Sequence, residues 1–167
     1  MKIKSLIFKV PEPELKIRKR LTIYISEKHS EIIFAPLSKE INAGYDFEQE
    51  ICEIIDLKSS TEIIGEAFKR NFNKFNISEN KKVSGKINDW PALQASKEKT
   101  KVGFEKNYSR FNVDGLTEHN LFFEIKTALC YPIEIELTTT ISSACENSSL
   151  GQRLLRLYNC DICDKKK

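Results

Sequence analysis

The alternation of apolar and polar positions predicts β-strands in the first third of the chain. Leu21–Ser26 carries leucine or isoleucine at every odd position, and the β-rich run Glu31–Ala35 follows after a short polar break. These two segments predict a hairpin, and Pro36 is expected to end its second strand or to confine that strand to a sheet edge. Further strands are predicted over Lys2–Lys9 and Ile51–Leu57.

Two longer amphipathic helices are predicted, one in each half of the chain. In the first, Ser59 and Glu62 have the spacing of a capping box, and apolar residues then recur every three or four positions from Ile64 to Phe75. The second helix is expected to begin near Asn147, with leucines and Tyr158 on its apolar stripe. Both helices therefore have one face suited to packing against a core.

Between these helices the sequence predicts short helices and then further strands. Asp89 is expected to cap a helix at Trp90–Leu93, because proline is well placed in a first turn. A second short helix, Lys99–Asn107, is expected to direct Val102 and Phe104 inward. The strands that follow are predicted over Tyr108–Val113, with a turn at Asp114-Gly115, and over Asn120–Ala128 and Tyr131–Leu137.

The two halves of the chain share an order of elements. In each half, β-rich segments lead through a serine-rich stretch into a helix that has a glycine in its first turns, Gly65 and Gly151 respectively. Glycine inside a helix costs about 1 kcal/mol relative to alanine, so we expect both glycines to allow close approach to a sheet. The pattern predicts an α+β fold with a mainly antiparallel β-sheet, helices packed on one face and a weak internal β-β-α duplication.

A chain of 167 residues is expected to form a single domain, 1–167. Within it we distinguish an N-terminal strand and charged connection (1–20), a first β/α half (20–80), a connecting helical segment (81–107) and a second β/α half (108–160). No apolar run approaches the roughly 20 residues that span a bilayer, and the N-terminus lacks the pattern of a signal peptide. The sequence therefore predicts a cytoplasmic protein that does not contact a membrane.

The cysteines and histidines do not form a recognisable motif. The five cysteines are an odd number, and the CxxC of Cys160 and Cys163 lacks the second ligand pair of a structural zinc site. His29 and His119 lie beside polar residues and are expected in exposed turns. The chain also lacks a phosphate-binding glycine loop, an HExxH motif and a nucleophile elbow. We therefore expect no catalytic residue, cofactor or metal; the alternative is a small enzyme using one histidine with a cysteine.

Charge is distributed in blocks, although the net charge is only +3. Residues 29–80 are acidic overall, and the acids crowd in and after a predicted loop, Lys39–Phe47, around Gly44. Such an acidic face steers basic partners. Residues 81–110 are basic and are a candidate for contacts with nucleic-acid phosphate, although aromatic residues do not alternate with these lysines as base stacking would require.

The order of these features resembles the CdiI-type immunity proteins of bacterial contact-dependent growth inhibition systems. The resemblance rests on the serine-rich start of the glycine-containing helix at Ser59–Phe68, the middle segment Trp90–Lys106 and the closing Ser148–Gly151 helix. It covers most of residues 20–160 but not the N-terminal extension or the CxxC. It implies a protein without catalytic activity that binds the C-terminal toxin domain of its own system, often a nuclease, as a stoichiometric inhibitor in the cytoplasm.

A nuclease must hold phosphate, so its active site is expected to be basic. The acidic stretch would then mimic nucleic acid and speed capture of the toxin, with aromatic side chains as anchors. If Ile51–Leu57 has one buried face, Glu53 would face water and Ile54 the core. The predicted toxin-binding residues are Glu40, Tyr45, Asp46, Phe47, Glu48, Glu50 and Glu53.

Two other functions fit the same sequence. One is a small nucleic-acid-binding module that uses the basic segment 81–110, and it predicts binding of RNA or DNA with a steep dependence on salt. The other is an interaction domain of a different system that shares the fold, because a fold does not determine a function.

Overall fold

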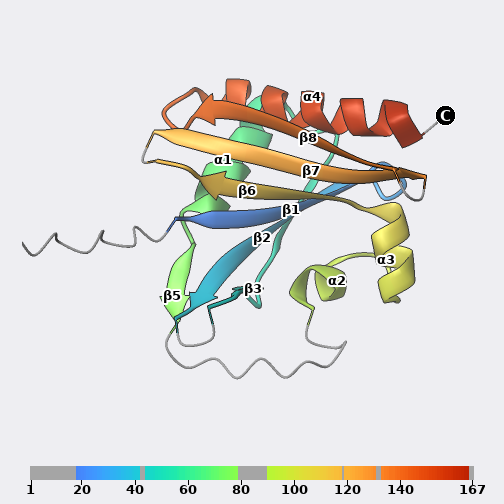
Figure 1. Ribbon diagram of the computed structural model, residues 1–167, viewed down its shortest axis with the longest axis horizontal. Helices are drawn as coiled ribbons and strands as arrows, with labels where there is room; N and C mark the ends of the chain where they lie inside the picture. Colours follow the sequence, from blue (N-terminus) through green and yellow to red (C-terminus); the bar gives the residue numbers. More distant parts are fainter. Residues whose placement is uncertain (1–17, 42–43, 79–89, 118, 131–132, 166–167) are drawn as a thin grey trace, which may run out of the picture.

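The computed structural model describes residues 18–41, 44–78, 90–117, 119–130 and 133–165. Eight strands and four helices follow one another in this part of the chain (Figure 1). None of the described helices combines the length and the hydropathy that a membrane span requires. In chain order the elements are β1 (Arg20–Ser26), β2 (Glu31–Glu40), β3 (Asp46–Glu48), β4 (Glu53–Asp56), α1 (Thr61–Phe72), β5 (Asn76–Ser78), α2 (Pro91–Ala95), α3 (Lys101–Asn107), β6 (Ser109–Gly115), β7 (Asn120–Cys130), β8 (Ile133–Ser142) and α4 (Asn147–Lys165).

The strands form one sheet in the order β3-β2-β1-β6-β7-β8, with β4 and β5 also paired with β2. All of these pairs are antiparallel except that of β5 with β2. The predicted α+β class with a mainly antiparallel sheet is therefore confirmed. The two halves also match in order, because β1, β2 and β4 lead to α1 just as β6, β7 and β8 lead to α4.

Strand β2 is longer than predicted because it continues through Pro36. The oxygen of Pro36 accepts a hydrogen bond from the backbone nitrogen of Gln49 at 2.8 Å. The nitrogen and oxygen of one strand residue face the same neighbour, so the proline nitrogen faces the irregular segment between β3 and β4. The missing N–H therefore removes no hydrogen bond of the ladder. The predicted loop Lys39–Phe47 is shortened from both ends, because β2 reaches Glu40 and β3 begins at Asp46, and Gly44 has a φ of 71°.

Strands in the second half also extend beyond their predicted ends. β6 includes Asp114 and Gly115, which were predicted as a turn, because both pair with residues of β7. β8 runs on to Ser142, which pairs with Asn120. The predicted strand Lys2–Lys9 lies outside the described residues.

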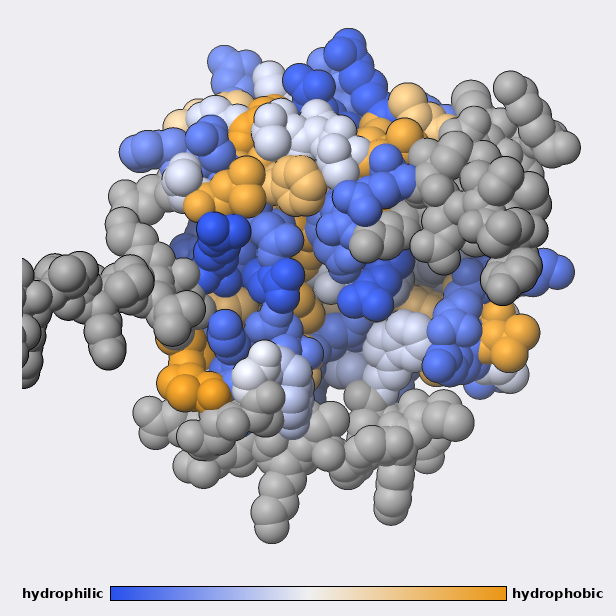
Figure 2. Space-filling view, viewed as in Figure 1, coloured by the Kyte–Doolittle hydropathy of each residue, from blue (hydrophilic) through white to orange (hydrophobic). Residues whose placement is uncertain are grey.

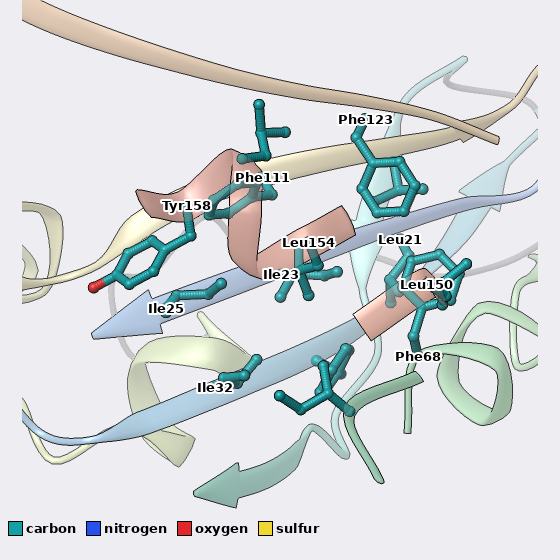
Figure 3. Close-up of a cluster of buried hydrophobic side chains, with 14 of the residues drawn as sticks. Leu21, Ile23, Ile25, Ile32, Phe68, Phe111, Phe123, Leu150, Leu154 and Tyr158 are labelled. Atoms are coloured by element: carbon teal, nitrogen blue, oxygen red, sulfur yellow. The ribbon is translucent and has the colours of Figure 1, made fainter. Parts of the chain in front are cut away.

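The larger core lies between the sheet and the two long helices, α1 and α4, which share one face (Figure 3). Alternate residues of the central strands point into it, and the apolar stripes of both helices close it. Burial of one such side chain stabilises the fold by about 1.5–3 kcal/mol. Its buried side chains include Leu21, Ile23, Ile25, Ile32, Phe34, Ile64, Phe68, Phe111, Phe123, Leu150, Leu154 and Tyr158.

The short helices α2 and α3 cover part of the opposite face of the sheet. There Tyr24 and Ile33 pack with Leu93 of α2 and Phe104 of α3. Val102, which was predicted to point inward, is 75% exposed. It lies only two residues before Phe104, and residues two apart in a helix do not share a face.

The first turns of α1 and α4 contact each other through two glycines. A Cβ atom on Gly65 would lie 1.9 Å from the carbonyl oxygen of Asn147, and one on Gly151 would lie 2.1 Å from that of Thr61. Thr61 and Asn147 are the first residues of the two helices, so the contact is reciprocal. The predicted approach of a helix to the sheet was wrong, because the glycines let one helix approach the other. The side chain that caps α1 is that of Ser60, not Ser59.

Replacing Gly65 by alanine is therefore expected to destabilise the protein. At an ordinary helix position the change would stabilise it by about 1 kcal/mol, whereas here it forces two backbones apart and should cost about 1–3 kcal/mol. Urea unfolding measures the difference. Glu66→Ala, one residue away and exposed, is the matched control and should shift stability by no more than about 0.5 kcal/mol. A stabilising Gly65→Ala would contradict the contact.

Candidate partner-binding surface

The acidic residues that were predicted to face a toxin mostly contact other parts of the protein. The guanidinium of Arg20 bridges the carboxylates of Asp46 and Asp114. These bonds, the one to Asp114 first, hold the pKa of Arg20 above its ordinary value. The side chain of Asp46 is 14% exposed. The guanidinium at the start of β1 thus compensates the negative charge of Asp46 at the start of β3.

The carboxylate of Glu48 joins three elements. One oxygen accepts hydrogen bonds from the Tyr24 hydroxyl at 2.6 Å and from the Trp90 ring nitrogen at 3.2 Å. The other accepts one from the backbone nitrogen of Ala92 at 3.0 Å. Glu48 therefore caps the N-terminus of α2 from a distant strand, a place where a negative charge is stabilising. The expected cap, Asp89, lies outside the described residues, and Trp90 makes no side-chain cap.

Glu53 faces α1 and not open solvent. It accepts hydrogen bonds from Arg70 at 3.1 Å and from Asn71 at 2.6 Å. These contacts, led by the bond from Arg70, lower the pKa of Glu53. The predicted orientation of β4 was wrong, because Ile54 is 45% exposed. Glu53 pairs with Phe34, and cross-strand partners share a face. Glu40 is also withdrawn from solvent, at 4% exposure.

Tyr45, Phe47 and Glu50 are the predicted residues that remain accessible, and they lie around an open groove. The groove has a volume of about 380 Å³. In Figure 2 a hydrophobic patch lies at the lower left, where Figure 1 places β5. The residues that line the groove come from β2, β3, the β3–β4 connection and β5, and are Ser38, Phe47, Gln49, Glu50, Ile51, Asn76, Ile77 and Ser78.

Exposed apolar side chains concentrate around this groove. Among the described residues, eight large hydrophobic side chains are exposed, and four of them, Ile41, Tyr45, Ile51 and Ile77, border or line it. Ile41 is next to β5 because its nitrogen donates to the oxygen of Ser78 at 3.3 Å. We call Ile41, Tyr45, Phe47, Glu50, Ile51 and Ile77 the groove surface. The exposure of the three isoleucines was not predicted from the sequence, because the residues next to an isoleucine in the chain do not show whether its side chain is exposed or buried.

The basic segment also has internal partners. Lys97 pairs with Glu31 at 2.9 Å, and Lys101 pairs with Glu105 one helical turn further on, at 3.6 Å. Two of the lysines that were candidates for phosphate contacts therefore already lie beside carboxylates.

A second polar cluster ties the β1–β2 turn to the α2–α3 connection. Glu98 accepts hydrogen bonds from Lys28 at 2.8 Å, from His29 at 2.6 Å and from Asn107 at 2.7 Å. The bond from Lys28, followed by that from His29, lowers the pKa of Glu98 to about 2. His29 lies in a turn as predicted, but its side chain is only 15% exposed because its ring stacks on Tyr108.

Within the described ranges, no group of three or more histidine, cysteine and acidic residues is placed to hold a metal ion. Cys52 and Cys145 are partly buried, and Cys160 is exposed. Burial, together with the charge of Glu48, raises the pKa of the Cys52 thiol to about 12.

Removing the Glu48 carboxylate is expected to loosen α2 from the sheet. Glu48→Ala should lower the free energy of unfolding by about 3 kcal/mol, because it leaves three donors without their charged acceptor. Glu48→Gln should cost less, since the amide keeps one acceptor oxygen. Urea unfolding followed by the fluorescence of Trp90, the single tryptophan, measures both. Equal stability of Glu48→Ala and the exposed control Glu66→Ala would rule out this role.

The Glu98 cluster predicts a loss of stability in acid. The pKa of Glu98 falls from 4.5 to about 2 on folding, so between these values the unfolded chain binds more protons than the folded one. Its contribution is complete above pH 4.5 and disappears as the pH falls toward 2. The difference in urea midpoint between wild type and Glu98→Gln should therefore shrink over this range. Glu105→Gln, at an exposed pair, should show little difference at any pH.

Two solved structures share the fold at low sequence identity. One is a protein of unknown function from Neisseria meningitidis, with a TM-score of 0.61 and 13% identity over 84% of this chain and 93% of that chain. The other belongs to the CdiA-CT/CdiI toxin and immunity complex from Yersinia pseudotuberculosis, with a TM-score of 0.59 and 10% identity over 89% of this chain and 97% of that chain.

The sequence itself matches no protein-family model and no curated protein. The likeness to the two solved structures is therefore one of fold. It extends over nearly the whole length of each neighbour, and one of these neighbours comes from a complex of a toxin with its immunity protein.

Proposed function

We propose that this protein is an immunity protein that binds the C-terminal toxin domain of a contact-dependent growth inhibition system and neutralises it by stoichiometric occlusion. The observation that carries the proposal is the fold shared with a chain of the CdiA-CT/CdiI toxin and immunity complex, over 89% of this chain. The toxin is expected to be a nuclease, and the complex is expected to form in the cytoplasm of the cell that makes both proteins.

Occlusion needs only a stable surface of sufficient size. Stable protein interfaces bury about 1,200–2,000 Å² in total, so the groove surface would form the centre of a larger contact. Tyr45, Phe47 and Glu50 would touch the toxin directly. Asp46, Glu48 and Glu53 would act indirectly, because their ion pairs and hydrogen bonds hold the strands that present those side chains. Glu40 would do the same from its buried position.

The proposal predicts that a large secreted protein is encoded next to this chain, and the test expresses the C-terminal domain of that protein. We expect that domain to arrest growth of a bacterial host when expressed alone and to be harmless when this chain is co-expressed. The two purified proteins should form an equimolar complex, which size-exclusion chromatography with light scattering measures.

Two results would contradict the proposal. In one, growth arrest persists although both proteins are present at equal levels, or this chain arrests growth by itself. In the other, the purified chain retards RNA or DNA in a gel at moderate salt and loses that binding steeply as salt rises, which would favour the nucleic-acid-binding module at 81–110.

A further inference from the structure

Among the residues that the structure describes, the groove surface combines a high density of exposed apolar side chains with few accessible charges. Ile51 is 78% exposed and Ile77 is 47% exposed, and both line the groove. The ring of Tyr45 lies edge-on to that of Phe47, with centroids 6.5 Å apart, and extends the apolar area. Contiguous exposed apolar patches on soluble proteins usually mark interaction sites.

Three of the described acidic side chains near the groove are bound by internal partners. Asp46 is paired with Arg20, Glu48 is held by Tyr24 and α2, and Glu53 is bound by Arg70. Among the described residues that line the groove, Glu50 is the only charged one, so a basic cleft would find a single carboxylate there, beside the exposed Ile51 and Ile77. The charge distribution consequently favours a partner whose contacting residues are apolar over one that offers a phosphate-binding site.

The backbone around the groove is held in place before any partner binds. The side-chain amide of Gln49 donates to the oxygen of Leu37 at 3.2 Å and to that of Lys74 at 2.7 Å. It thereby ties the β3–β4 connection to β2 and to the segment that leads into β5. A preformed site loses less conformational entropy on binding, which raises affinity without new contacts.

We infer that the toxin is held by an apolar anchor, one or more bulky aliphatic or aromatic side chains that insert between Ile51 and Ile77. Recognition by this chain would then depend on apolar burial and not on mimicry of nucleic acid by carboxylates. The toxin's anchor would be a protruding apolar residue and not part of a basic active-site cleft. This inference rests on the proposed function, because it names the chemistry of the same partner.

The test uses four variants with matched exposure. Ile51→Lys is compared with Val102→Lys, whose parent side chains are 78% and 75% exposed, and Ile77→Lys with Ile63→Lys, at 47% and 48%. Val102 and Ile63 lie on α3 and α1 and do not line the groove. Because all four positions are exposed, the variants should fold, and circular dichroism with urea unfolding checks this.

Binding of each variant to the neighbouring-gene toxin domain is measured by calorimetry or surface plasmon resonance. Each groove variant is expected to raise Kd by at least about 30-fold, as loss of an interface hot spot does, whereas each control should change Kd by less than about threefold. The association rate of the wild type should change little between low and high salt. An association that is steered by charge would instead slow steeply as the salt concentration rises.

The outcomes separate this inference from the proposed function. If the wild type binds no toxin domain, the proposed function fails. If the wild type binds but the groove variants bind as well as their controls, or if Glu50→Lys alone abolishes a strongly salt-dependent association, the apolar anchor is wrong and the function stands. A wild-type dimer that Ile51→Lys converts to monomers would show that the groove holds a second copy of this chain.

Discussion

The reciprocal contact between the first turns of α1 and α4 fixes how closely these two helices lie against each other. Each helix approaches the other so closely that a Cβ atom would overlap a backbone carbonyl, at Gly65 in one and Gly151 in the other. With the two helices joined there, both can lie on one face of the sheet and close a single large core (Figures 1 and 3). Because protein interiors are close-packed, a change in the distance between these two helices would also displace the strands that they cover.

The two faces of the sheet are covered differently. The long helices bury the side chains on one face of the central strands. On the opposite face, the described helices α2 and α3 pack on the part formed by β1 and β2. Glu48 fixes that cover, since its carboxylate binds a strand tyrosine and the first turn of α2 together. A residue that local sequence marks as part of an acidic surface thus has a structural task.

Local sequence patterns correctly predicted the strands and helices in which one side is apolar along the whole element. The alternation in β1 and the stripes of α1 and α4 were sufficient, because one side of each element is uniformly apolar. The orientation of β4 was not predictable in this way. Ile54 and Ile55 are adjacent, so alternation cannot say which of them faces the core, and only pairing with Ile33 and Ile32 of β2 decides it.

The candidate site was predictable only in part for the same reason. Tyr45, Phe47 and Glu50 are accessible, but the partners that bind their acidic neighbours come from β1, α1 and α2. These partners are 17 to 44 residues away in the chain, a distance at which no local spacing rule applies. The exposed isoleucines of β5 and of the β3–β4 connection likewise could not be predicted to lie together, because only the fold brings these two segments to one groove.

Pro36 has a consequence for how this protein avoids unwanted association. It interrupts the supply of backbone donors at the point where β2 passes from one outer partner to the next, between β3 and β4. A strand from another molecule that paired along that border would therefore lack one hydrogen bond of a regular ladder. A single proline within a buried strand thus makes that border a poorer template for backbone pairing than an uninterrupted strand would be.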